Sequence, residues 1–301
     1  MKTMRRGTKI LLIVAASLMA AGILISAAAA LSGGRFNKTA AEDVTHRANG
    51  AFESIRIVTS SSDVSVKISE SGECYAVCSE NDKLTYSLVT EGGTLTLTEN
   101  DSRKWYDHIG IFFGTMKVTL YVPQGAYTEL SVRNGSGNIV CSEQDISFES
   151  VSLSAASGNI FFRTPADELS ARSSSGEISV RGSTCSKIEL LNVSGNIEAE
   201  SADVREMSVR TQSGNIQLRE ITVMSVLSAE SSSGNIDMER CDADTLELKS
   251  SSGNIRGTLL SDKIFNLKTN SGKIEAPESV RDAGICNAST SSGNIRFEIA
   301  D

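Results

Sequence analysis

Ser213-Gly214-Asn215-Ile216 is one copy of the four-residue motif that decides how this chain folds. Ser-Gly-x-Ile occurs nine times, and the third residue is Asn in seven copies and Glu177 or Lys273 in the other two. Repetition at intervals of 18 to 21 residues indicates a repeat architecture. We expect the motif glycines to form sharp turns at positive φ, Gly214 among them. They are Gly137, Gly158, Gly176, Gly195, Gly214, Gly234, Gly253, Gly272 and Gly293.

Apolar and polar side chains alternate on both sides of each motif. Around Gly214 the apolar positions are Met207, Val209, Ile216 and Leu218, and mostly polar residues lie between them. A period of two indicates strands with one buried face, so each unit is predicted to hold two short strands facing one core. The motif isoleucines are predicted to form one continuous internal row. They are Ile139, Ile160, Ile178, Ile197, Ile216, Ile236, Ile255, Ile274 and Ile295.

The unit cannot bury its apolar face alone, but parallel stacking at about 4.8 Å per coil buries it continuously. We therefore predict an all-β fold, a parallel β-solenoid with two short strands in each coil of about 19 residues. A propeller blade needs four strands in about 40 residues, which this unit cannot supply. Small polar residues three before each glycine, such as Thr211, are predicted to turn inward and bond the turn. The joint between units is predicted to be a loop of variable length.

The N-terminus has the features of a membrane anchor. Four basic residues lie in residues 1–9, and residues 10–31 are almost wholly apolar. Such a segment spans roughly 33 Å as a helix, enough to cross a bilayer. The basic flank predicts a cytoplasmic N-terminus and an extracytoplasmic body. The alternative is a cleaved signal peptide with a small-x-small site at Ala28 and Ala30.

Three further regions follow the apolar segment. Residues 32–50 are predicted to be a polar linker, 51–125 an irregular β opening or cap, and 126–301 the solenoid repeats. Within the opening, Ser62-Asp63-Val64 and Gly93-Thr94-Leu95 resemble decayed copies of the motif.

An aromatic insertion over residues 103–116 departs from the strand pattern. It is predicted to be either a flap over the end of the core or an exposed loop that grips a partner. The candidate partner-binding residues are Trp105, Tyr106, His108, Phe112 and Phe113.

Charge argues against nucleic acid as a partner. The chain has 29 basic and 37 acidic residues, and four of the basic ones precede the apolar segment, so the remainder carries 25 − 37 = −12. An acidic body repels phosphate backbones.

No catalytic or metal-binding pattern is found. The chain has only two histidines, His46 and His108, which limits any nucleophilic triad. The densest acidic group, Asp237, Glu239 and Asp242, is interpreted as a solvated turn. The six cysteines are interpreted as small buried apolar residues rather than a disulfide framework. We predict no cofactor, no metal and no enzymatic activity.

The chain resembles a bacterial family described as a "putative adhesin" β-strand-repeat domain of unknown function. The resemblance is carried by the apolar N-terminus, the Ser-Gly-Asn-Ile repeats and Val118-Thr119-Leu120-Tyr121-Val122-Pro123. It covers about residues 51–301 and implies a cell-envelope location without catalytic residues. We expect a single-pass membrane protein whose solenoid acts as an adhesin-like or structural binding module for wall polymer or an envelope protein. The alternatives are an accessory or sensor component of an envelope-stress system and a glycan-active solenoid enzyme.

Overall fold

The computed structural model describes Met19 and residues 41–103 and 116–300, and Ala41–Asp301 is one compact unit. The described residues of this unit form strands that belong to one sheet. The strands are β1 (Glu42–Arg47), β2 (Ser54–Thr59), β3 (Asp63–Ile68), β4 (Tyr75–Glu80), β5 (Leu84–Glu91), β6 (Thr94–Asp101), β7 (Lys117–Val122), β8 (Gly125–Ser136), β9 (Ile139–Cys141), β10 (Ile146–Ser157), β11 (Ile160–Phe162), β12 (Ala166–Ser175), β13 (Ile178–Arg181), β14 (Thr184–Ser194), β15 (Ile197–Ser213), β16 (Ile216–Ser231), β17 (Ile236–Ser250), β18 (Ile255–Leu259), β19 (Lys263–Ser271), β20 (Ile274–Glu275), β21 (Gly284–Ser292) and β22 (Ile295–Ile299).

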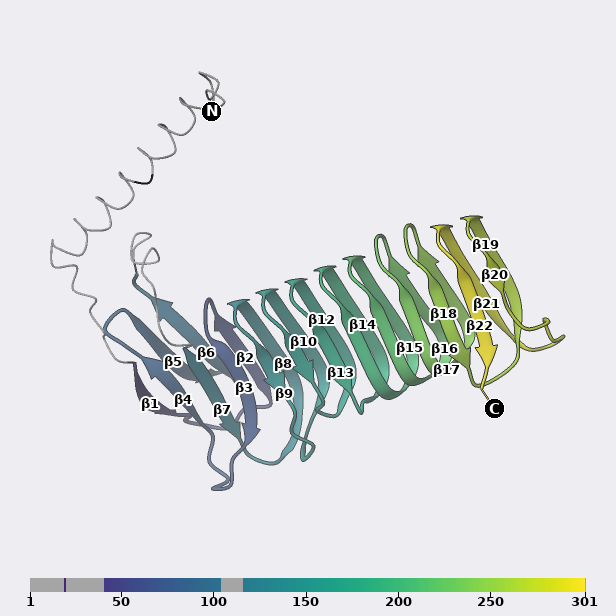
Figure 1. Ribbon diagram of the computed structural model, residues 1–301. Coiled ribbons are helices and arrows are strands. Elements are labelled where there is room, and N and C mark those ends of the chain that lie inside the picture. The colour runs from purple at the N-terminus through teal and green to yellow at the C-terminus, as the bar shows by residue number, and fades with distance from the viewer. Residues whose placement is uncertain (1–18, 20–40, 104–115, 301) are drawn as a thin grey trace, which may run out of the picture. The chain divides into compact units, whose positions relative to one another are not determined.

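The strands coil around one core in a parallel β-solenoid of about nine turns, which confirms the predicted fold class (Figure 1). Each coil supplies one strand before the motif and one after it. The strands before the motif pair with each other, as Leu153 with Ala171, and those after it pair likewise, as Ile160 with Ile178. Equivalent side chains therefore stack in register from coil to coil.

Alternating burial along each strand produces the core. In β10, Val151, Leu153 and Ala155 are buried, whereas between them Ser152 is exposed and Ser154 is half-buried. One apolar face therefore lines the interior and one polar face meets water.

The joints between units were predicted to be loops. In the middle of the solenoid they are continuous strands instead. β15, β16 and β17 each run from one unit into the next without a loop. The chain bends there at Ser201, Glu220 and Arg240, whose φ angles are 56°, 51° and 52°. A single residue in the left-handed region is enough to turn the strand at these corners.

The last coil is inserted one place earlier than its position in the chain. β21 pairs with both β17 and β19, and β22 pairs with both β18 and β20. The coil with β21 and β22 therefore lies inside the coil with β19 and β20. The predicted isoleucine row followed chain order and is corrected here. In the structure it ends in the order Ile255, Ile295, Ile274. Ile274 is in the outermost coil, where it is 45% exposed.

At the N-terminal end of the solenoid a coil is also inserted out of chain order. β2 lies between β6 and β8, and β3 lies between β7 and β9. Ser62-Asp63-Val64 occupies the place of the motif, because Val64 pairs with Ile139. The interpretation of Gly93-Thr94-Leu95 as a motif copy was wrong. Leu95 pairs with Ile55 of the strand before the motif, and Gly93 turns the hairpin between β5 and β6.

Antiparallel strands close this end. β5 pairs with β6, β4 pairs with β7, and β1 pairs with β4. β1 lies within the predicted linker 32–50, where Val44 pairs with Cys78. Part of that segment is therefore a strand, because the edge of β4 offers unpaired backbone groups that a further strand can satisfy.

The anchor predicted over residues 10–31 lies outside the described residues, apart from Met19. In the part of the chain that the structure describes, we find no helix with the length and apolarity needed to cross a bilayer.

Candidate functional site

The motif glycines are required by the close approach of neighbouring turns. A Cβ atom at Gly214 would lie 2.0 Å from the carbonyl oxygen of Gly195, and at the other eight glycines the same distance to the adjacent turn is between 1.8 and 2.6 Å. Gly158 has a positive φ of 145°, as predicted, but the φ of Gly214 lies outside the left-handed range. Steric exclusion by the neighbouring backbone, rather than φ, therefore explains the glycine at position 214.

The motif asparagines form a hydrogen-bond ladder. The Asn196 side-chain oxygen accepts from the Asn215 N–H at 2.9 Å, and Asn215 accepts from the Asn235 N–H at 2.9 Å. The ladder ends at Lys273, whose N–H donates to Asn294 at 2.9 Å. Lys273 belongs to the outermost coil, so no further amide needs an acceptor from it.

The row of small polar residues three before each glycine and the row of motif isoleucines also have structural roles. Thr211 donates to the Gly195 carbonyl at 3.2 Å, and Ser231 donates to the Gly214 carbonyl at 3.0 Å. Eight of the nine motif isoleucines are fully buried, with Ile274 as the exception. These rows hold the turns and the core together and leave the outward faces free for function.

The aromatic residues predicted to grip a partner, Trp105, Tyr106, His108, Phe112 and Phe113, lie outside the described residues.

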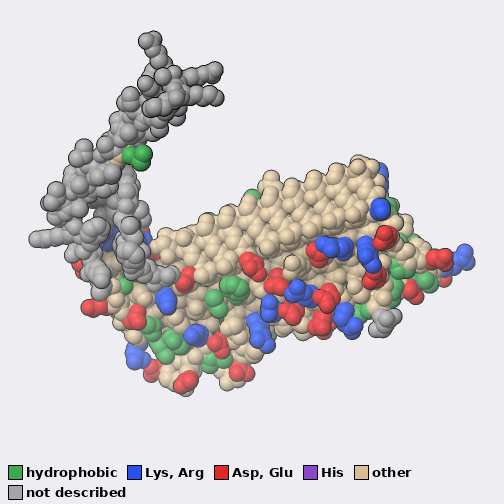
Figure 2. Space-filling view, in the orientation of Figure 1, with side chains coloured by type: hydrophobic (Ala, Val, Ile, Leu, Met, Phe, Trp, Pro, Cys, Tyr) green, Lys and Arg blue, Asp and Glu red, His purple; other side chains and the backbone are tan. Residues whose placement is uncertain are grey.

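The outward side chains after the motif form a face of alternating charge, here called the charged face. It consists of the outward residues that directly follow the motif in β13, β15, β16, β17, β18, β20 and β22. Lys and Arg side chains are interspersed with Asp and Glu along the coils (Figure 2). Such exposed pairs contribute little stability each, but together they favour one register of the stack. The ion pairs are Arg181–Glu198 at 3.4 Å, Arg181–Glu200 at 3.4 Å, Arg219–Glu198 at 3.0 Å, Arg219–Glu239 at 3.5 Å, Arg256–Asp237 at 3.0 Å, Arg296–Glu298 at 2.5 Å and Arg296–Glu275 at 3.9 Å.

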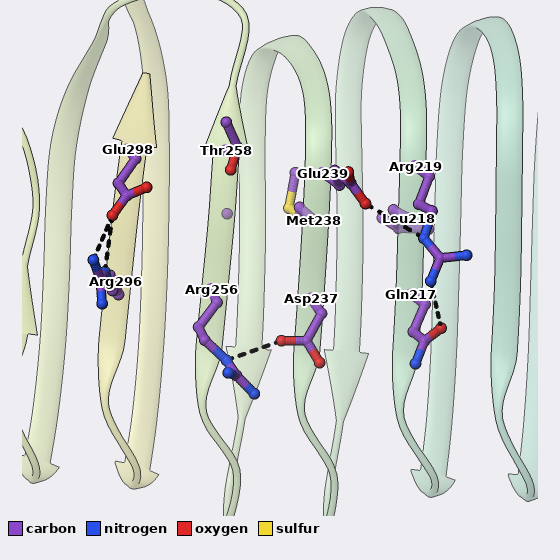
Figure 3. Close-up of a pocket in the computed structure, with 11 residues that line it drawn as sticks. Gln217, Leu218, Arg219, Asp237, Met238, Glu239, Arg256, Thr258, Arg296 and Glu298 are labelled. Atoms are coloured by element: carbon purple, nitrogen blue, oxygen red, sulfur yellow. Dashed lines mark hydrogen bonds and ion pairs between the residues drawn. The ribbon is translucent and has the colours of Figure 1, made fainter. Parts of the chain in front are cut away.

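A hollow of about 500 Å³ opens on the charged face between β16, β17, β18 and β22 (Figure 3). It exists because Thr258 of β18 is short, whereas Glu239 and Glu298 on the adjacent strands are long. Arg256 and Arg296 line it, and both also line a second hollow of about 270 Å³ that includes Lys273. Arginine, carboxylate and hydroxyl groups together suit a polar ligand with both charged and neutral groups.

The acidic residues interpreted as a solvated turn lie on strand β17 instead. Asp237 and Glu239 point outward on the charged face. The buried Lys263 forms an ion pair with Asp242, in which its Nζ donates to the carboxylate at 2.5 Å. The sequence pattern could not show this pairing, because Lys263 belongs to the next unit.

His46 lies in the cap, and most of the cysteines lie in the core. The His46 ring lies 2.6 Å from the Glu80 carboxylate, which links β1 to β4. All six cysteines are free thiols, and burial raises the pKa of Cys141 to about 12. Within residues 41–103 and 116–300 no three metal-binding side chains are grouped closely enough to hold an ion.

Comparisons with known proteins agree with this fold. A family profile described as "Toastrack DUF4097" matches residues 52–295. A "putative adhesin" of Bacteroides fragilis has a TM-score of 0.51 at 16% identity, covering 85% of this chain and 96% of its own. A "putative lipid binding protein" of Parabacteroides distasonis has a TM-score of 0.53 at 19% identity, covering 85% and 96%.

A "putative adhesin" of Parabacteroides merdae has a TM-score of 0.53 at 13% identity, covering 85% of this chain and 95% of its own. No curated protein matches the sequence significantly. The resemblance found from the repeats is confirmed, and at these identities the solved structures show the fold alone.

Arg256 and Arg296 are the site residues that the sequence did not reveal as neighbours. They lie forty residues apart, in units seven and nine of the repeat. The available signal was Gly257, a departure from the apolar core pattern, whose missing side chain leaves room for the Phe297 ring when the last coil is inserted.

Proposed function

The chain belongs to the Toastrack DUF4097 family, and from this membership we propose that it is a non-enzymatic binding module displayed on the outside of a bacterial cell. The observation that carries the proposal is the charged face. It repeats outward side chains in register along stacked parallel strands, which suits an extended partner that contacts several coils. The adhesin names of two structural neighbours support the same role.

In this proposal the N-terminal segment is the anchor. The apolar residues 10–31 span the membrane, residues 1–9 stay in the cytoplasm, and the solenoid lies outside. The partner is a polymer or protein of the cell envelope. The net charge of −12 beyond residue 9 makes non-specific binding to anionic surfaces unfavourable, so contact depends on local features of the solenoid.

Two measurements test the proposal. Protease added to intact cells that express a C-terminally tagged full chain is expected to remove the tag, whereas a cytoplasmic marker survives. The detergent-solubilised full chain is then expected to sediment with isolated cell-wall fragments. A protected tag contradicts the extracytoplasmic location, and absence of co-sedimentation contradicts the binding role.

A further inference from the structure

Where two charged residues of the charged face are paired on neighbouring strands, their signs are opposite in every case but one. Opposite charges on adjacent strands attract, and like charges directly opposite each other are destabilising. Of the six pairs in which both residues are charged, five join opposite signs, and Arg256 with Arg296 joins two cations. The six pairs are Arg181–Glu200, Glu200–Arg219, Arg219–Glu239, Asp237–Arg256, Arg256–Arg296 and Arg296–Glu275.

The inserted coil creates this exception. If the coils stacked in chain order, Glu275 of β20 would lie between Arg256 and Arg296, and the alternation would continue. Because β22 pairs with β18 instead, the two arginines are adjacent and Glu275 lies beyond Arg296.

Both arginines keep hydrogen-bonding capacity for a ligand. Arg256 uses its Nε toward Asp237 at 3.0 Å, and its two terminal nitrogens have no partner among the described residues. Arg296 directs Nε and one terminal nitrogen to the same oxygen of Glu298, at 3.0 and 2.5 Å, and its Nε also lies 3.9 Å from the Glu275 carboxylate, so its other terminal nitrogen remains for a ligand. The two guanidinium groups are on neighbouring strands at the edge of the hollow (Figure 3).

We propose that Arg256 and Arg296 bind one carboxylate group of an acidic glycan, and that the attached sugar occupies the hollow beside Thr258. The inference rests on the proposed function and names its ligand class. The planar guanidinium group matches a carboxylate with two parallel hydrogen bonds. The hollow of about 500 Å³ is within the usual size of a small-molecule site.

The surroundings favour a carboxylate over a phosphate. Asp237, Glu239 and Glu298 line the same hollow, so a group with nearly two negative charges would be repelled more than a group with one. Gln217 and Thr258 supply neutral donors and acceptors for sugar hydroxyl groups.

The test uses the detergent-solubilised full chain and titration calorimetry with three probes. They are tetragalacturonate, its fully methyl-esterified form and inorganic phosphate. Tetragalacturonate is expected to bind, and Arg256→Gln or Arg296→Gln is expected to weaken it at least about tenfold, the loss of one charge-assisted contact. The matched control is Arg181→Gln, which lies on the same face outside the hollow and between acidic neighbours.

Thermal unfolding without ligand separates binding from folding. Because Arg256 has a like-charged neighbour, Arg256→Gln is expected to leave the melting temperature unchanged or to raise it. Loss of binding together with a much lower melting temperature would overturn the assignment. So would equal binding of the methyl ester, a comparable loss in Arg181→Gln, or phosphate binding as tight as that of tetragalacturonate.

Wall-fragment sedimentation, run in parallel, distinguishes failure of the proposed binding function from failure of the arginine site. If the wild-type chain sediments with wall fragments but does not bind tetragalacturonate, the proposed function stands and this site is wrong. If it does neither, both fail.

Discussion

Gly257 lies directly against the ring of Phe297, a residue that belongs to the coil two units further along the chain. A Cβ atom at Gly257 would be 2.8 Å from Cε1 of Phe297. At this position of the repeat the other inner coils bury a side chain, such as Met238 or Leu218. The Phe297 ring of the inserted coil therefore fills the space that a side chain at position 257 would occupy.

This relationship predicts strong coupling between the two positions. Gly257→Ala is expected to destabilise the solenoid by about 2 kcal/mol, since the added methyl group clashes with a buried ring. Phe297→Leu alone leaves a cavity and costs about 1–3 kcal/mol. The double variant is expected to be clearly more stable than the sum of the two changes predicts, and urea unfolding measures all three. Simple additivity would contradict the inserted order of the coils.

The stacked turns predict a second effect at Gly214. Gly214→Ala places a methyl carbon 2.0 Å from the Gly195 carbonyl oxygen. We expect a loss of about 3 kcal/mol or more in the free energy of unfolding, because two backbones must separate to admit it. Ser213→Ala at the adjacent exposed position is the control, with an expected change within about 0.5 kcal/mol. Equal effects of the two changes would contradict the steric role of the glycine.

The solenoid could be predicted from the sequence because its evidence is local and repeated. Each motif copy, such as the one at Gly214, carries its own turn and its own alternation of apolar residues. The order of the end coils could not be predicted in the same way. Ile274 and Ile295 satisfy the pattern equally well, and only the long-range fit of Phe297 to Gly257 distinguishes their places in the stack.

The asparagine ladder predicts that the same change has different effects in the middle and at the end of the stack. Asn215→Ala leaves the half-buried N–H of Asn235 without its acceptor and is expected to cost about 1–2 kcal/mol. Lys273→Ala removes a side chain that no further coil uses, so it is expected to cost less than about 0.5 kcal/mol. Chemical denaturation of both variants measures the difference. A loss at Lys273 as large as that at Asn215 would refute the ladder as the reason for asparagine.

The buried thiols predict a fall in stability at high pH. Burial raises the pKa of Cys141 to about 12 and that of Cys241 to about 11, from an ordinary value of 9.0. The unfolded chain then loses thiol protons first, so the free energy of unfolding is constant below about pH 9 and decreases as the pH rises toward about 12.

Alkylation gives the corresponding kinetic measurement. At pH 8 the thiols of the folded chain are expected to react with iodoacetamide only as fast as the protein opens. The variant Cys141→Ala is expected to be less stable at pH 8 but to lose less stability between pH 9 and pH 11. A slope identical to that of the wild type would show that Cys141 does not contribute.

The candidate site was harder to predict than the fold for a physical reason. Burial constrains which side chain can occupy a core position, whereas an outward position such as Thr258 accepts many residues. The alternation of Arg219 with Glu239 is readable once the units are aligned. The adjacency of Arg256 and Arg296 depends on the inserted coil and therefore on the three-dimensional structure.

Both ends of the solenoid are closed by local exceptions to chain order, while every coil from β10 to β17 follows its predecessor. Duplication of one inner unit, for example residues 196–214, would therefore lengthen the protein by about one strand spacing of 4.8 Å without disturbing either terminus. The length of a solenoid of this architecture can then change through the number of its inner units, while the coils that close its two ends stay the same.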